Sequence, residues 1–292
     1  MEIELRDLRY FLAVAQLESI TKAADYLFIA QPSLSRRMQK LESELDKKLF
    51  VRGSRKVTLT QAGLLLKKRA EEMLQLYEKT QSELLADGEN LSGDVYIGGG
   101  ESCSVRIVAR AAKEIMSKHP EVKFHFFSGD THDVKDKLDK GLIDFGVFVE
   151  PSELADYDYV RLPAADTWGV LMLKSSELAK KESVTADDLK CLPLICSRHS
   201  VIKKALDEWF SAADCKPEIN VTYNLIYNAS LMVEEGMGYA IGLDRLINTE
   251  GTDLCFRPLE PRLEARLVVA WKKHQIMSKA SGAFLNALKN QL

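Results

Sequence analysis

Hydrophobic side chains recur at helical spacing through the first 45 residues of the chain. The pattern predicts three helices, over residues 6–16, 19–27 and 31–45. The second helix is short, and Ser19 or Thr21 can cap its first turn. Two adjacent alanines lie on its inner face, and such small side chains let two helices cross closely. The chain is therefore expected to begin with a compact helical unit.

The third predicted helix separates apolar and polar side chains onto opposite faces. Its buried stripe consists of Leu34, Met38, Leu41 and Leu45. Its opposite face carries Pro32, Arg36, Gln39 and Lys40, with Ser33 and Ser35 on the flanks. Pro32 suits the first turn, where the N–H that proline lacks would have no helical partner. Arg37 falls at the rim of the buried stripe, where it would meet a phosphate or a neighbouring acid.

A β-hairpin is predicted after these helices. Residues 49–51 and 57–59 have the composition of strands, and the segment between them places Arg52 and Arg55 at the tip. Since a helix-turn-helix followed by such a hairpin is a winged helix, residues 1–60 are predicted to form one domain of this type.

Residues 61 to about 87 form a long amphipathic run. Its apolar positions alternate spacings of four and three, which is typical of a coiled-coil seam, and such a helix needs a partner. A linker and dimerisation helix is therefore predicted over residues 61–90. Thr80 lies in the seam, and the residues predicted to dimerise are Leu66, Ala70, Met73, Tyr77 and Leu84.

Strand and helix patterns alternate beyond a Gly-containing break at residues 88–93. This rhythm predicts an α/β domain over residues 91–292, with a parallel sheet covered on both faces. It falls into two series, which predict two subdomains with a cleft between them. Subdomain I is expected at about 91–162 and 266–292, and subdomain II at about 163–265.

Positive charge is concentrated in one part of the chain. Residues 31–60 hold eight Lys and Arg against three acids, whereas residues 61–292 hold 29 basic and 35 acidic residues. The whole chain of 292 residues has a net charge of −3. A basic patch on an otherwise acidic protein indicates that this patch alone has a polyanionic partner.

The polar face of the third helix suits the recognition of DNA bases. The second helix of a helix-turn-helix lies in the major groove, where Gln31 can pair with adenine and Arg36 with guanine. Serines on this face and arginines of the hairpin suit phosphates or the minor groove. The alternative is a merely solvated basic face. The predicted DNA-binding set is Gln31, Pro32, Ser33, Ser35, Arg36, Arg37, Lys40, Arg52 and Arg55.

A second candidate site lies at the carboxyl ends of the predicted strands, where open α/β sheets bind ligands. Ser102 and Ser104 precede a helix whose N-terminus favours an anion, and Arg198 or His199 could add positive charge. A small organic acid is therefore the hypothesis for the ligand. Alternatively, the serines only cap the helix and Arg198 is solvated. The predicted set is Ser102, Cys103, Ser104, Asp130, Thr131, Phe148, Arg198 and His199.

Composition limits the class of protein. A chain with 46% hydrophobic and 28% charged residues suits a soluble globular protein of two or three domains. It has no apolar run of about 18 residues and no pattern of a secretory signal, so a cytoplasmic protein without membrane contact is expected. The five cysteines are odd in number and include no Cys-x-x-Cys, which argues against a disulfide framework or a zinc site. A redox switch is the minor alternative, with Cys191 and Cys196 closest in sequence.

Catalytic motifs are missing from the sequence. It contains no phosphate-binding loop, no Gly-x-Ser-x-Gly elbow and no His-Glu-x-x-His. The protein is therefore predicted to be no enzyme and to hold neither metal nor cofactor. A second class of function is the alternative, in which the chain is a small-molecule receptor or enzyme whose N-terminal helices serve only for assembly. That class predicts no salt-sensitive affinity for DNA.

The segment from 19 to 63 carries a specific set of motifs. They are Ala23-Ala24-x-x-Leu27, Gln31-Pro32-x-Leu34-Ser35-Arg36, Leu41-Glu42, Leu49-Phe50-x-Arg52 and Leu59-Thr60-x-Ala62-Gly63. This run closely resembles the DNA-binding domain of LysR-type transcriptional regulators. The rest of the chain is similar to that family in length and architecture.

The resemblance implies an α/β protein with an N-terminal winged helix-turn-helix, a linker helix and a two-subdomain effector domain similar to periplasmic binding proteins. It implies a sequence-specific regulator that binds double-stranded operator DNA and is controlled by a small effector in the cleft. Such proteins resemble dimers of dimers, and RNA polymerase is a further candidate partner. Ser102 matches a position where the family often has a Ser or Thr that contacts the effector.

Three positions depart from the family pattern. Ile20 stands where Phe is usual, which is a tolerable core exchange. Ala30 replaces a Ser or Thr before Gln-Pro, so the third helix needs another cap, for which Gln31 is a candidate. Asp46 replaces Gly and must end that helix with a less permissive backbone.

Overall fold

The computed structural model describes residues 3–53, 56–85, 91–150, 154–197 and 200–292. The chain divides into two compact units, Met1–Leu85 and Ala86–Leu292, and each is described by itself. Within the described part of the chain, no helix is long and apolar enough to cross a membrane.

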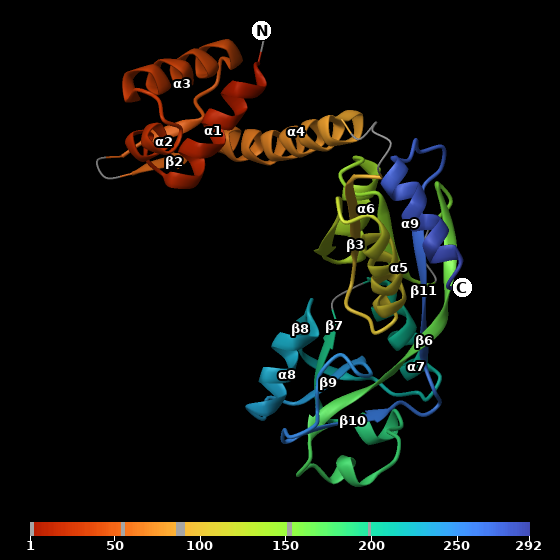
Figure 1. The fold of residues 1–292 in the computed structure, drawn as a ribbon. Coiled ribbons are helices and arrows are strands. Elements are labelled where there is room, and N and C mark those ends of the chain that lie inside the picture. The colour runs from red at the N-terminus through yellow and green to blue at the C-terminus, as the bar shows by residue number, and fades with distance from the viewer. Residues whose placement is uncertain (1–2, 54–55, 86–90, 151–153, 198–199) are drawn as a thin grey trace. The chain divides into compact units, whose positions relative to one another are not determined.

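The first unit is a winged helix-turn-helix with a long C-terminal helix (Figure 1). The predicted three helices and the hairpin are confirmed. Phe50 pairs with Leu59 in the antiparallel hairpin. Leu34, Met38 and Leu41 lie fully buried in one core with Phe11, as their helical spacing predicts. The elements are α1 Leu5–Leu17, α2 Ile20–Tyr26, α3 Gln31–Leu45, β1 Phe50–Arg52, β2 Val57–Leu59 and α4 Gln61–Leu85.

The helix ends follow from local residue types. Ser19 caps α2 by accepting a hydrogen bond from the backbone N–H of Lys22 at 3.3 Å. Ala30 is the N-cap of α3 without any side-chain cap, so Gln31 does not supply one. Pro32 in the first turn compensates in part, because it lacks one of the N–H groups that need a partner. Asp46 ends α3 in the left-handed region with a φ of 48°.

A buried carboxylate ties α3 to the hairpin. Glu42 accepts hydrogen bonds from the backbone N–H groups of Leu49 at 2.8 Å and Phe50 at 3.2 Å, and Lys48 pairs with it at 3.4 Å. Only 7% of Glu42 is exposed. Charged side chains are seldom buried without partners, and these three contacts supply them. The Leu-Glu pair of the motif therefore fixes the start of the hairpin on α3.

The start of α4 packs closely on the same hairpin. Thr60 donates a hydrogen bond to the carbonyl of Lys48 at 2.6 Å and accepts one from the N–H of Gly63 at 3.0 Å. A Cβ at Gly63 would overlap the carbonyl oxygen of Leu49. The motif Leu-Thr-x-Ala-Gly is thus explained by a helix cap and a close backbone approach.

The predicted dimerisation seam of α4 has two different parts. Ala70 is fully buried and Leu66 packs against the core of the same unit, so these two residues face their own domain. Met73, Tyr77 and Leu84 are 48%, 37% and 73% exposed. A helical apolar stripe has the same spacing whether it packs on its own domain or on another chain, so Leu66 and Ala70 do not need a partner chain, and dimerisation through Met73, Tyr77 and Leu84 stays a prediction.

The second unit contains one continuous mixed sheet. Its strands follow the order β4-β3-β5-β11-β6-β9-β7-β8, with β10 paired to β6. The strands are β3 Gly93–Gly99, β4 Val122–Ser128, β5 Phe145–Val149, β6 Tyr157–Leu173, β7 Pro193–Ser197, β8 Glu218–Tyr223, β9 Tyr239–Leu243, β10 Leu254–Pro258 and β11 Glu264–Lys272. The helices are α5 Val105–Lys118, α6 Thr131–Asp139, α7 Ser200–Ser211, α8 Ile226–Glu234 and α9 Lys279–Lys289, with short 3-10 turns at Glu177–Lys180 and Asp187–Leu189.

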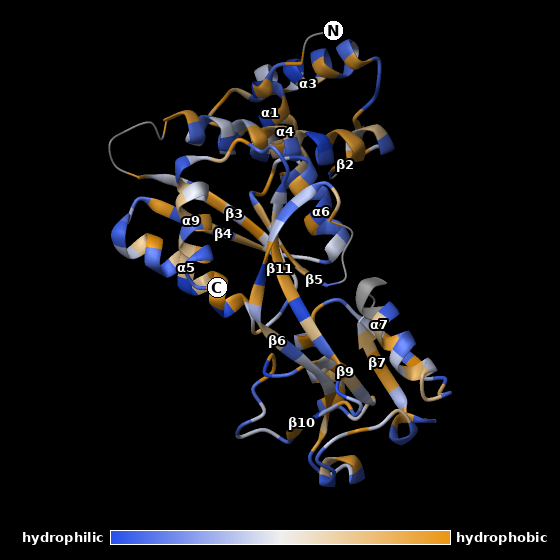
Figure 2. Cartoon of the chain, turned by 90° about the vertical axis from the view of Figure 1, so that its right-hand side faces the viewer, coloured by the Kyte–Doolittle hydropathy of each residue, from blue (hydrophilic) through white to orange (hydrophobic). Residues whose placement is uncertain are grey.

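The sheet has two halves, each with helices on both faces, and its strands form the apolar interior seen in Figure 2. In the first half, α5 and α9 cover one face and α6 the other. In the second half, α7 and α8 lie on opposite faces. The strands β3, β4 and β5 pair in parallel, as do β7, β8 and β9. The expected parallel sheet is therefore correct within each half.

Two long antiparallel strands, β6 and β11, join the halves, and the sequence did not predict this pairing. β6 begins at Tyr157 and passes through Pro163. It pairs with β11 on both sides of a register shift between Arg266 and Val268. The proline lies in this irregularity, where a missing N–H costs little. β10 was not predicted at all.

Candidate functional site

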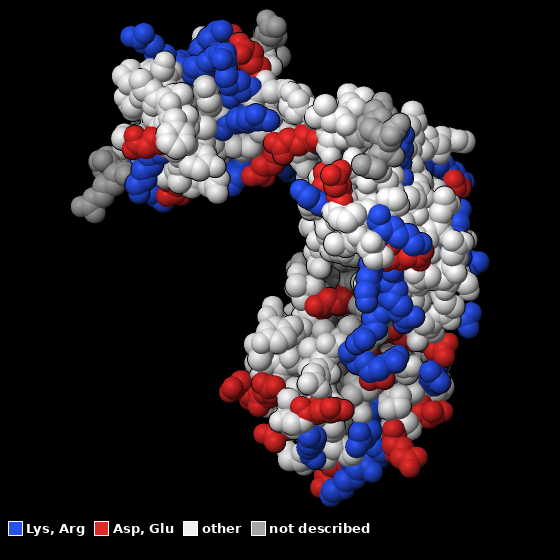
Figure 3. Space-filling model, in the orientation of Figure 1, with Lys and Arg blue, Asp and Glu red and all other residues white. Residues whose placement is uncertain are grey.

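The first unit presents one polar helix face. Figure 3 shows Lys and Arg side chains gathered on the α3 side of this unit. Gln31, Pro32, Ser33, Arg36 and Lys40 are exposed on α3, as their spacing predicts. Ser35 is half-buried, and Lys40 pairs with Glu44 at 3.5 Å.

The adjacent arginines of α3 have different surroundings. Arg37 lies 3.3 Å from Asp7 and 3.4 Å from Glu4, both at the start of α1. Arg36 has no ion pair or side-chain hydrogen bond within the described residues and points its exposed guanidinium to solvent. Of the two expectations for Arg37, a phosphate or a neighbouring acid, the structure shows the acid. Arg36 is thus available to an external partner, and Arg37 is engaged inside the unit.

The ion pair between Arg37 and Asp7 involves a buried carboxylate. The carboxylate is almost fully buried, and burial raises its pKa, while the nearby Arg37 acts in the opposite direction. The ion pair therefore offsets part of the cost of burying Asp7 and positions α3 against α1.

The two hairpin arginines are less well defined. Arg52 ends β1, but its side chain is not described, and Arg55 lies outside the described residues. Both stay predictions as DNA contacts.

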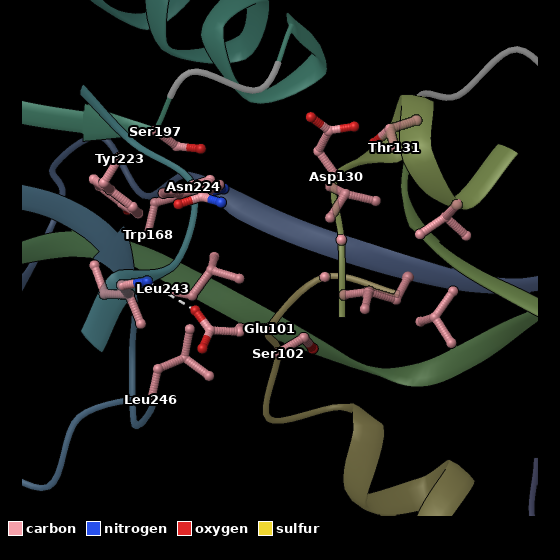
Figure 4. A pocket seen from close by; sticks show the side chains of 17 residues that line it. Glu101, Ser102, Asp130, Thr131, Trp168, Ser197, Tyr223, Asn224, Leu243 and Leu246 are labelled. Atoms are coloured by element: carbon pink, nitrogen blue, oxygen red, sulfur yellow. Dashed lines mark hydrogen bonds between the residues drawn. The ribbon is translucent and has the colours of Figure 1, made fainter. Parts of the chain in front are cut away.

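The second unit contains a cleft between the halves of its sheet (Figure 4). Ser102, Asp130 and Thr131 line it, in agreement with the position predicted for them. Phe148 does not line it, because this side chain points into the core beneath α6, and its neighbours Val147 and Val149 line the cleft instead. Strand alternation sends Phe148 to the opposite face.

The remaining predicted residues lie elsewhere. Cys103 donates its Sγ–H to the carbonyl of Arg245 at 3.2 Å and is not part of the cleft wall. Ser104 is buried and does not line the cleft. Arg198 and His199 lie outside the described residues, directly after Ser197, which lines the cleft.

A buried carboxylate organises the serine segment before α5. Ser102 donates its hydroxyl hydrogen to Asp166, and Ser104 donates to the other oxygen of Asp166 at 3.2 Å. Ser102 Oγ also accepts from the N–H of Ser104 at 3.0 Å. Neither serine side chain caps α5 in the ordinary way, so the simple capping alternative is wrong, while the anionic ligand stays a prediction. Asp166, from β6, is 1% exposed.

Glu101 connects the two halves across the cleft. Its Oε2 accepts a hydrogen bond from the backbone N–H of Ile226 at 2.8 Å, at the first residue of α8 (Figure 4). The residue before α8, Leu225, offers no side-chain cap, so a carboxylate 125 residues away supplies one.

Several lining residues were absent from the predicted set. Asn224 and Leu243 stand at strand ends, where the strand-end rule could have found them. Trp168 lies inside the long β6, whose extent was not recognised. Tyr223 donates its hydroxyl to the carbonyl of Ile241 at 2.7 Å, and burial raises its pKa.

The five cysteines are all free thiols. Cys196 is buried, and burial raises its pKa to about 12, which opposes thiolate chemistry. Cys191, its neighbour in sequence, is exposed. No cluster of metal ligands occurs among the residues described.

Two family models match the chain. The model for bacterial regulatory helix-turn-helix proteins of the lysR family matches residues 5–64, and the LysR substrate binding domain matches residues 88–292. The Hca operon transcriptional activator HcaR of Escherichia coli (strain K12) is 28% identical and covers 99% of this chain and 98% of its own length. A probable RuBisCO transcriptional regulator of Porphyra purpurea is 30% identical and covers 81% of this chain and 76% of its own length.

Solved structures show the same fold. The crystal structure of CbnR, a LysR family transcriptional regulator, has a TM-score of 0.81 at 18% identity and covers 99% of each chain. Full-length CbnR complexed with its target DNA has a TM-score of 0.80, also at 18% identity, over 99% of this chain and 100% of that one.

Proposed function

Because the chain belongs to the LysR family of transcriptional regulators, we propose that it recognises its operator sequence through α3 and that a small effector in the cleft controls this binding. Family membership also confirms the prediction that the protein is a regulator and not an enzyme. In this proposal residues 1–60 bind DNA, residues 61–90 link and dimerise, and residues 91–292 bind the effector.

The observation that carries the proposal is the state of Arg36. This guanidinium is exposed on α3 and unpaired within the described residues, while three fully buried residues on the opposite face hold the helix in place. Gln31 and Ser33 share its exposed face. A bidentate contact from Arg36 to guanine and one from Gln31 to adenine would give sequence preference. CbnR, which shares this fold, has been crystallised in complex with its target DNA, and this supports DNA binding by the present chain.

The cleft suits an effector because its wall comes from both halves. Ser102, Asp130 and Thr131 belong to the first half, and Ser197, Asn224 and Leu243 belong to the second. A ligand that contacts both halves stabilises the arrangement in which they approach, and it can shift the protein only by its difference in affinity between two arrangements. Effector binding is thereby linked to the arrangement of the two halves of this unit.

Self-association is proposed through the outer part of α4. Met73, Tyr77 and Leu84 expose apolar surface along this helix, joined by Leu65 and Leu76. Exposed apolar patches of this kind mark protein interfaces. We expect a dimer through this surface, its further assembly into a dimer of dimers, and RNA polymerase as a partner of the DNA-bound form.

The test measures binding of the full-length protein to DNA. The operator is obtained by selection from a random duplex pool, and its affinity is compared with that of a scrambled duplex by fluorescence anisotropy. Six phosphate contacts would lower the affinity about a thousandfold between 50 and 200 mM salt. Equal affinity for both duplexes would contradict sequence recognition. A flat salt dependence would favour the alternative in which the N-terminal helices serve only for assembly.

A further inference from the structure

A basic groove of about 480 Å³ lies beside the cleft and is lined by a different set of residues. Arg106 and Arg110 come from α5 in the first half of the sheet domain, and Arg245 comes from the loop after β9 in the second half. Figure 3 shows Lys and Arg side chains gathered over α5 on the second unit. This surface, the arginine groove, therefore brings positive charge from both halves together.

The chain does not neutralise the two arginines of α5. Arg106 and Arg110 are exposed, and neither makes an ion pair or a side-chain hydrogen bond within the described residues. They stand four positions apart, which places both side chains on one face of the helix. Glu114, one turn further along α5, is already paired with Lys118 at 2.7 Å. Two guanidinium groups of the groove are thus free to attract an external anion.

The third guanidinium is positioned by a contact between the halves. The carbonyl of Arg245 accepts a hydrogen bond from Cys103 Sγ at 3.2 Å, which holds the loop after β9 against the segment before α5. The side chain of Arg245 is 67% exposed, and its Nε lies 3.6 Å from Asp244 Oδ2. That distance is longer than a hydrogen bond, and an exposed pair of this kind is weak. Arg245 can therefore give its N–H groups to a ligand.

The carboxylate in the groove does not cancel this charge. Asp166 is the acid among the described residues that line the groove, and it is 1% exposed. Its two oxygens accept the hydroxyl hydrogens of Ser102 and Ser104. Three guanidinium groups against one carboxylate give the described lining a net charge of +2. An anion in the groove consequently meets net attraction.

The number and type of the cations favour a phosphate group. A guanidinium presents paired N–H donors in a plane, which match two oxygens of a phosphate or a carboxylate. A phosphate monoester has three terminal oxygens and close to two negative charges at pH 7.5, because its second pKa is about 6. A single carboxylate offers two oxygens and one charge. The groove is also large enough for an organic body, since small-molecule pockets measure roughly 300–1,000 Å³.

We propose that the arginine groove is a second ligand site, which binds a small phosphate ester through Arg106, Arg110 and Arg245. The site goes beyond the proposed effector cleft and does not depend on it. A ligand held by Arg106 and Arg245 contacts both halves of the sheet domain at once, so it stabilises the arrangement in which these two residues approach.

The groove and the cleft share two of their walls. Ser102 lines the cleft and Ser104 lines the groove, and both are hydrogen-bonded to Asp166. Leu243 and Leu246 line the cleft, whereas Arg245 between them lines the groove. A phosphate ester in the groove therefore acts on the same two segments that a ligand in the cleft contacts.

The test compares ligands of matched size and different charge. Glycerol 3-phosphate, succinate and glycerol are each titrated into the full-length protein at pH 7.5 and constant ionic strength, with binding measured by calorimetry. Glycerol 3-phosphate is expected to bind at least about tenfold more tightly than succinate, because its charge and oxygens are concentrated on one group. Glycerol is expected not to bind.

One variant in each half tests whether the ligand bridges them. Arg106→Gln and Arg245→Gln should each weaken binding of glycerol 3-phosphate about ten- to hundredfold, because each removes a charge-assisted contact. Lys190→Gln is the matched control, since Lys190 is exposed, lies outside the groove and loses the same charge. It should leave binding unchanged. Thermal melting without ligand should be the same for all three variants, which shows that the fold is intact.

Four results would overturn the assignment. If Lys190→Gln weakens binding as much as Arg106→Gln, the attraction is general and not a site. If Arg245→Gln binds like the unaltered protein, the ligand does not bridge the halves. If succinate binds more tightly than glycerol 3-phosphate, the phosphate class is wrong. If no ligand binds and the arginine variants change the association state in sedimentation, the groove is a contact between copies. Operator binding tests the regulator function independently of all four.

Discussion

The two candidate surfaces of this protein differ in how they are assembled. The proposed DNA-reading face comes from one helix, α3, and its residues lie within ten positions of one another. The cleft is built by segments from Gly100 to Leu267, and the contact between Glu101 and Ile226 joins residues 125 positions apart. A surface on one helix is encoded by local periodicity. A surface between strand ends depends on the topology that brings those ends together.

The largest expected effect comes from the close approach at Gly63. Gly63→Val should destabilise the first unit by about 3 kcal/mol, because the new side chain overlaps the backbone of Leu49. Operator binding should fall, while ligand binding in the second unit should persist. Differential scanning calorimetry of the full chain measures the loss.

Gly282→Ala is the matched control for this change. Gly282 lies inside α9 with open space around its Cβ position, so alanine should stabilise by up to about 1 kcal/mol. If both glycine substitutions had the same effect, the close approach at Gly63 would not explain the motif.

The next effect tests the link from α3 to the hairpin. Glu42→Ala removes the acceptor of two buried N–H groups and should cost about 2–3 kcal/mol of stability. Glu44→Ala is the control, because Glu44 lies on the same helix but is more exposed than Glu42. It should cost less than about 0.5 kcal/mol. Urea unfolding followed by far-UV circular dichroism, which reports on the helices of the first unit, separates them, and equal midpoints would refute the role of Glu42.

Local periodicity could be predicted from the sequence, whereas contacts between distant segments could not. The exposure of Arg36, Gln31 and Ser33 on one face of α3 could be predicted because a helix has a fixed period. The motif residues Glu42 and Gly63 were recognised as a resemblance, but their roles as hydrogen-bond acceptor and close contact appear only in the fold. Phe148 was misplaced, and Trp168 was missed, because a strand's face and length depend on its partners. No local signal in the sequence connects Glu101 with α8.

A smaller effect distinguishes the adjacent arginines. Arg36→Ala should weaken operator binding by about 1–3 kcal/mol and relax base preference, with little change in stability. Arg37→Ala should instead lower stability, since it leaves the buried Asp7 without its cation. Anisotropy on an operator series and thermal melting give the two readouts. The comparison fails if Arg37→Ala relaxes base preference as much as Arg36→Ala does.

The smallest effect concerns pH. Burial raises the pKa of Asp7 above its ordinary value of 3.8, so the folded state favours the protonated carboxyl. The contribution of Asp7 to stability is therefore greatest below that ordinary value and declines as pH rises through the raised pKa. Asp7→Asn should flatten this slope in thermal melts of the full chain between pH 3.5 and 6. An unchanged slope would place the pH dependence elsewhere.

The pairing of β6 with β11 determines how the two halves of the effector domain can move. In the described residues the chain crosses between the halves along these two strands, which are hydrogen-bonded to each other. A loop hinge would rotate about a few backbone torsions, whereas a paired ribbon resists bending and deforms by twisting. The ladder is interrupted near Pro163, so the twist is softest there. If the proposed effector draws the two halves together, we therefore expect an elastic torsion of limited amplitude rather than a free hinge motion.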